Sequence, residues 1–130
     1  MSRSLEDFLA LPDVDNIEEE VFVSKRLGKF KVKAMTQDEF GEYQKRARGR
    51  ISKDGIDFDT GKFQLLMVAG QTVEPDFKNA ELLKKCNCVS STDLIKKKLL
   101  SGEIAELARQ IQIVSGFDTD SKEDIEEAKN

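Results

Sequence analysis

The chain contains no histidine, which removes the most common general base and the most common metal ligand found in proteins. Most hydrolase mechanisms and most zinc sites are therefore excluded. The only cysteines, Cys86 and Cys88, are too close in sequence to form a good disulfide, and two sulfurs cannot complete a four-coordinate zinc site. We expect both thiols to be reduced and partly buried.

Long apolar runs are also missing. The longest covers only residues 65–69, far below the roughly 18 residues that a membrane span requires. The acidic N-terminus does not have the layout of a signal peptide. With 35% charged residues and a net charge of -4, the 130-residue chain is predicted to be one well-solvated domain in the cytoplasm, with no membrane partner.

Sequence motifs for catalysis or cofactor binding are absent too. The chain has no phosphate-binding loop, dinucleotide fingerprint, nucleophile elbow or metal-ligand spacing. A calcium loop starting at Asp57 fails, because its fifth position is Gly61 and its twelfth is Val68. We therefore predict no enzyme activity, and no catalytic, cofactor-binding or metal-binding residues.

Residues 91–117 carry the strongest helical pattern in the chain. We expect Ser101 to cap the helix, Gly116 to end it, and Glu103 to lie on its polar side. Ile113 lies opposite Ile104, so it contacts a second element or is offered to a partner. The apolar stripe that should face a core consists of Leu100, Ile104, Leu107, Ala108, Ile111 and Val114.

The N-terminal part begins with a short docking segment, in which Ser4 caps a helix with Leu5, Phe8 and Leu9 on one face. Residues 6–20 hold seven acids and no base, which indicates a solvated lead-in. Alternating apolar residues at about 21–34, around a turn at 25–29, then predict a β-hairpin.

After the hairpin, the four residues from Thr36 to Glu39 form a capping box that should start a helix. Residues 51–61 are predicted to be a loop or a second, weak hairpin, and residues 71–76 a connector. Further helices should follow Asn79 and Ser91.

The segment 63–69 is apolar on nearly every side, so its helix is either centrally buried or the floor of an apolar groove. We favour burial. If the groove exists, the candidate partner-binding residues are Phe63, Leu66, Met67 and Ile113. The predicted fold is mainly α (α+β): one helical domain over residues 1–117 with a hairpin at about 21–34, followed by an acidic exposed tail over 118–130.

Residues 25–50 support an alternative function, because they hold nine basic residues against three acidic ones. Such a stretch is typical of proteins that bind nucleic acid or act as small regulators. The acidity of the whole chain opposes this reading. The helix that would enter a DNA groove also opens with Glu103 and Glu106, which would repel phosphates.

The order and spacing of several short segments resemble the XkdN-like tail assembly chaperones of contractile-tailed phages and prophages of Gram-positive bacteria. The acidic lead-in, the hairpin and the capping box are similar to that family as well. The segments that carry the resemblance are Pro75-Asp76-Phe77, Ala80-Glu81-Leu82-Leu83, Asp93-Leu94-Ile95, Leu100-Ser101-Gly102-Glu103-Ile104 and Ile113-Val114-Ser115-Gly116-Phe117.

The resemblance implies a non-catalytic chaperone that coats the hydrophobic tape measure protein, keeps it soluble and helps tail-tube subunits polymerise around it. It implies action in the cytoplasm of the bacterial host, with no place in the mature virion. Such chaperones are often made in two lengths by ribosomal slippage, and Ala128-Lys129-Asn130 can be encoded by a slippery sequence. We therefore expect the tape measure protein as partner, and the tail-tube protein as a partner of a longer, frameshifted form.

Overall fold

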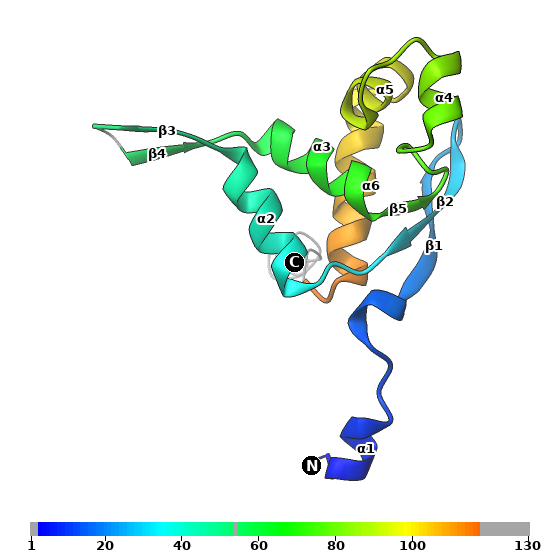
Figure 1. Cartoon of the computed structure of the whole chain (residues 1–130). Coiled ribbons are helices and arrows are strands. Elements are labelled where there is room, and N and C mark those ends of the chain that lie inside the picture. Colours follow the sequence, from blue (N-terminus) through cyan, green and yellow to red (C-terminus); the bar gives the residue numbers. More distant parts are fainter. Residues whose placement is uncertain (1–2, 54, 118–130) are drawn as a thin grey trace, which may run out of the picture.

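The computed structural model describes residues 3–53 and 55–117. The acidic tail predicted for residues 118–130 lies outside the described residues, and the proposed domain limits therefore stay a prediction. Within the described part, helices alternate along the chain with the strands of small antiparallel sheets (Figure 1). The predicted fold class, mainly α in an α+β arrangement with an N-terminal hairpin, is confirmed.

The sheet is built on the predicted hairpin. Strands β1 (Glu18–Ser24) and β2 (Gly28–Lys33) pair antiparallel, with Val21 opposite Phe30. Gly28 begins β2 with a φ of 73°, a backbone conformation that residues other than glycine rarely adopt. A third strand, β5 (Thr72–Glu74), pairs with β2, which gives the order β1-β2-β5. The prediction of a connector at 71–76 is therefore wrong, because three residues are too few to show an alternating pattern.

Helix α6 (Ser101–Val114) packs on this sheet, and the other helices are arranged around it. They are α2 (Gln37–Ala47), α3 (Thr60–Gln71), α4 (Ala80–Lys85) and α5 (Ser91–Lys98). Helix α6 packs against α3, β1 and β2, while α2 and α5 pack against α3 (Figure 1). The largest fully buried apolar side chains at the centre are Val32, Met67, Val68, Leu94, Ile95, Leu107 and Ile111.

The helix boundaries follow the predicted signals closely but not residue by residue. Thr36 and Glu39 form the predicted capping box, with reciprocal bonds of 3.0 and 3.1 Å. Gly116 ends α6 at a φ of 91°. The caps of the last two helices lie one residue earlier than predicted, because Ser90 caps α5 and the residue before α6 is Leu100. Ser91 and Ser101 are instead the first residues of their helices.

Two segments project from this core. Strands β3 (Arg48–Ser52) and β4 (Gly55–Phe58) form a separate hairpin, which decides between the loop and the second hairpin predicted there (Figure 1). At the other end, helix α1 (Leu5–Leu9) and a 3-10 turn (Val14–Asn16) lead into β1. We call residues 4–17 the N-terminal arm; it extends away from the helices and the sheet (Figure 1).

Candidate partner-binding surfaces

The predicted partner-binding residues are mostly inside the core. Phe63, Leu66 and Met67 on α3 are 8%, 6% and 0% exposed, and Ile113 on α6 is half-buried. Helix α3 is thus the centrally buried helix, the alternative that the sequence favoured. A direct role of these side chains in binding stays a prediction, and Leu66 also lines a surface groove.

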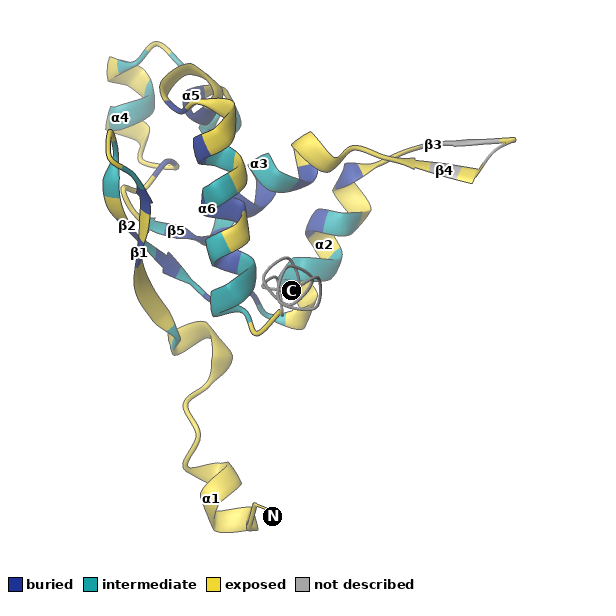
Figure 2. Cartoon of the chain, turned by 180° about the vertical axis from the view of Figure 1, so that it is seen from behind, coloured by how far each residue is buried: buried dark blue, intermediate teal, exposed yellow. Residues whose placement is uncertain are grey.

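The N-terminal arm presents the apolar side chains that the core does not use. Leu5, Phe8 and Leu9 are 73%, 63% and 72% exposed, and no residue of α1 is buried (Figure 2). Leu11 and Val14 continue this exposed apolar surface along the arm. The helix is nevertheless properly started, since the Ser4 hydroxyl accepts a hydrogen bond from the Asp7 N–H at 3.2 Å.

The arm is also strongly acidic, with four acidic residues and no basic ones between positions 4 and 17. Large apolar side chains that share an exposed face and carry charges around them mark a surface for another protein. The docking segment predicted at the start of the chain is therefore exposed in the structure, and its role in docking stays a prediction.

A second surface, the α3–α5 groove, lies where the start of α3 meets α2 and α5. Its volume is about 470 Å³. A smaller hollow of about 270 Å³ shares Gly61, Leu65 and Lys96 with the groove and extends it to Ile104 on α6. The side chains of Leu65 and Leu66 are half-buried and buried, whereas the basic side chains are exposed. The groove is lined by Arg46, Asp59, Gly61, Lys62, Leu65, Leu66, Thr92 and Lys96.

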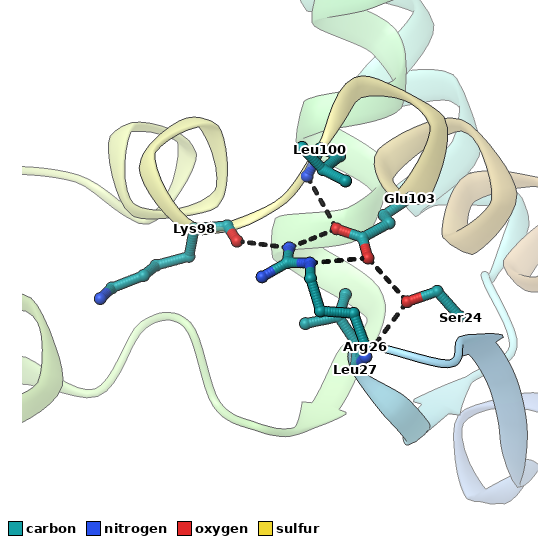
Figure 3. A network of polar contacts seen from close by, with 6 residues as sticks. All are labelled: Ser24, Arg26, Leu27, Lys98, Leu100 and Glu103. Atoms are coloured by element: carbon teal, nitrogen blue, oxygen red, sulfur yellow. Dashed lines mark hydrogen bonds and ion pairs between the residues drawn. The ribbon is translucent and has the colours of Figure 1, made fainter.

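A polar network joins the start of α6 to the β1–β2 turn (Figure 3). The Glu103 carboxylate accepts hydrogen bonds from the Ser24 hydroxyl at 2.6 Å and from the Leu100 N–H at 2.8 Å, and it forms an ion pair with Arg26. Arg26 also donates to the Lys98 carbonyl at 2.8 Å, which ties the turn to the end of α5. One carboxylate therefore starts α6 and fixes it to the sheet.

Glu103 was predicted to lie on the polar side of its helix, and this was wrong, because the side chain is buried against Ser24 and Arg26. The Arg26 guanidinium, followed by the Ser24 hydroxyl, lowers the pKa of Glu103 to about 2. A general base works best with a pKa near the working pH, so this carboxylate is a poor proton acceptor at neutral pH. The network is suited to structural support.

A second buried network ties α2, α3 and β2 together. The Tyr43 hydroxyl donates to the Gln71 side-chain oxygen at 2.6 Å. The Gln71 amide nitrogen in turn donates to the carbonyls of Lys33 and Ala34 at 3.3 and 3.0 Å. Gln71 is fully buried, and burial raises the pKa of Tyr43 to about 12. Both residues are thus part of the scaffold that supports the two surfaces.

Over residues 3–53 and 55–117, no group of three or more His, Cys, Asp or Glu side chains is placed to hold a metal ion. In the same part of the chain, no helix is both long enough and apolar enough to cross a membrane. The half-buried Cys86 and Cys88 are free thiols, as the sequence predicted.

Comparison with known proteins identifies the family. A sequence model of the phage XkdN-like tail assembly chaperone proteins matches residues 5–129, nearly the whole chain. The crystal structure of the protein yqbn is similar to this structure, with 26% sequence identity, a TM-score of 0.67, and coverage of 91% of this chain and 100% of that one. No curated protein matches the chain. The predicted resemblance is confirmed by the family match, and the chain belongs to the phage XkdN-like tail assembly chaperone family.

Proposed function

We propose that this chaperone binds the tape measure protein of its phage, keeps it soluble and assists polymerisation of the tail tube around it, without catalysis. The observation that carries the proposal is the family match over residues 5–129. The protein would act in the cytoplasm of the host cell and leave the assembled tail.

The arm and the α3–α5 groove support this proposal physically. A tape measure protein is long and hydrophobic, so keeping it soluble requires apolar surface that the chaperone has not buried in its own core. Leu5, Phe8 and Leu9 supply such surface on the arm, and the four arm acids keep it solvated. Leu65 and Leu66 supply a second apolar surface beside basic side chains in the groove.

Co-expression tests the proposal directly. The tape measure protein is expressed alone, with this chain, and with a variant carrying Phe8→Ser and Leu9→Ser. We expect the soluble fraction to rise with the natural chain and to fall back with the variant. Phe22→Ser is the matched control, because Phe22 is 54% exposed on β1, outside the arm. Equal insolubility with and without the chain, together with no co-purification, would refute the proposal.

A longer, frameshifted form is the second part of the proposal. In it, the domain described here holds the tape measure protein, and an extension recruits tail-tube subunits. The sequence at Ala128-Lys129-Asn130 is compatible with a slippery heptamer but does not require one. Sequencing the gene and measuring the masses of the native products decide this point, since a non-slippery codon set or a single product during infection rules slippage out.

Nucleic-acid binding through residues 25–50 is less well supported by the contacts. Within this stretch, Arg26 pairs with Glu103, Lys31 lies 3.7 Å from Glu18, and Lys33 lies 3.8 Å from Glu39. We expect no tight binding to generic duplex DNA at about 0.15 M salt. A submicromolar affinity that weakens steeply with salt would favour the nucleic-acid function instead.

A further inference from the structure

We propose that the N-terminal arm of one copy of this protein docks in the α3–α5 groove of a second copy. The arm has exposed apolar side chains without cover, and the groove has an apolar floor without an occupant among the described residues. The inference uses the same two surfaces that support the proposed binding of the tape measure protein, but it concerns the purified chain alone and is tested without that partner.

The charges of the two surfaces are complementary. The arm carries four acidic residues and no basic ones. The groove carries Arg46, Lys62 and Lys96, all exposed, against the single acid Asp59. Asp59 is already engaged, because its side chain accepts a hydrogen bond from the Lys62 N–H at 3.0 Å as the cap of α3. Opposite charges across a contact speed its formation and exclude wrong partners.

The apolar parts are also matched in kind. Leu5, Phe8 and Leu9 are spaced three and four residues apart, so they lie on one face of α1. A short helix with this spacing binds by inserting its apolar face in a groove between helices. The groove offers Leu65 and Leu66, and its extension reaches Ile104 on α6.

The topology favours a second copy over the arm's own groove. The arm enters the sheet at Glu18, which pairs with Lys33, at the end of the hairpin far from its turn. Helix α5, which lines the groove, contacts the opposite end, where Arg26 in the turn bonds the Lys98 carbonyl. The seven residues of β1 separate the two ends by about 20 Å. Figure 1 shows the arm directed away from α5.

Such a contact joins two different patches, so each copy both donates an arm and receives one. It is small, and we expect association in the weak range, half complete at concentrations on the order of 100 µM. Because part of the attraction is between charges, association should weaken as salt rises.

Sedimentation equilibrium of the purified chain tests the proposal. The arm variant carries Phe8→Ser and Leu9→Ser, and the groove variant carries Lys62→Glu and Lys96→Glu. Each alone should lose self-association by about tenfold or more, while Phe22→Ser should associate like the natural chain. Before the variants are compared, circular dichroism is used to check that each one is folded.

Mixing the two variants shows whether the loss of association comes from loss of the arm–groove contact or from a general change in solubility or charge. The arm variant keeps an intact groove, and the groove variant keeps an intact arm, so the mixture should regain a one-to-one complex. Monomeric behaviour of the natural chain at every concentration would overturn the proposal. Association that survives either set of substitutions, or a mixture that stays monomeric, would overturn it as well.

Discussion

The Tyr43 hydroxyl provides a sharp test of how the scaffold is held together. Tyr43→Phe removes the donor that lies 2.6 Å from the Gln71 side-chain oxygen and leaves that oxygen without this hydrogen bond in a fully buried position. A buried polar atom that loses its partner costs about 1 to 3 kcal/mol. For a chain of this size, each kcal/mol lowers the melting temperature by about 3 to 5 °C.

The neighbouring residue provides a matched comparison. Thr72 also has a buried hydroxyl, but this oxygen has no hydrogen-bond partner among the described residues. Thr72→Val removes the hydroxyl without removing any partner's bond, so its expected effect is neutral to stabilising. Each substitution removes one buried hydroxyl, and the two are expected to differ in stability by at least about 1 kcal/mol.

Urea unfolding followed by circular dichroism measures both effects. The expected result is a lower midpoint for Tyr43→Phe with an unchanged slope, and an equal or higher midpoint for Thr72→Val. The reasoning is refuted if Tyr43→Phe is as stable as the natural chain, or if Thr72→Val is equally destabilising. A changed slope would mean that the compactness of the denatured or native state has changed or that unfolding is no longer two-state, and would leave the hydrogen bond unsupported as the cause.

Three further outcomes follow from the same contacts. Gly70→Ala should destabilise the fold by more than about 1 kcal/mol, because the added Cβ would overlap the Tyr43 hydroxyl, and a normal melting temperature would contradict this. The pKa of Tyr43 is raised to about 12 from 10.0. Its contribution to stability is therefore present below about pH 10 and is lost as the pH rises towards 12. Tyr43→Phe should remove this part of alkaline unfolding. The pKa of Glu103 is lowered to about 2 from 4.5, so its contribution is present above about pH 4.5 and lost as the pH falls towards 2. Glu103→Gln should lower stability at neutral pH and flatten the acid limb, and an acid limb identical to that of the natural chain would argue against the Arg26 pair.

Local signals predicted most of the elements. The capping box at Thr36 is complete within four residues, and the alternation in β2 needs only the strand itself. The buried side of α3 was predicted because an apolar segment without a polar face must be covered. Such features are encoded by residues close together in the sequence and do not depend on distant parts of the chain.

The features that sequence reasoning missed depend on distant residues. Glu103 is 79 positions from Ser24 and 77 from Arg26, so its burial could not be read from the helix alone. A weak signal existed, since Glu103 is the third residue of α6 and its carboxylate bonds the Leu100 N–H. Strand β5 exists because β2 offers it an edge.

The candidate site was predicted only in part. The docking segment at the N-terminus was expected from Leu5, Phe8 and Leu9, whose side chains the structure leaves exposed. The contribution of α2 and α5 to the α3–α5 groove was not predicted, because the point where these helices meet α3 is set by the core. The alternative in which residues 63–69 floor a groove shares Leu65 and Leu66 with the α3–α5 groove, whereas Phe63 and Met67 are buried in the core.

The position of α6 also has consequences for how the protein is made. Met67 and Val68 are synthesised well before residues 101–114, yet α3 is packed against α6 in the finished fold. During translation, α3 is therefore made before the helix that covers it, and contacts of such long sequence separation form late. Exposed apolar surface on an unfinished chain promotes aggregation. We therefore expect this chain to be most exposed to aggregation before residues 101–114 have left the ribosome.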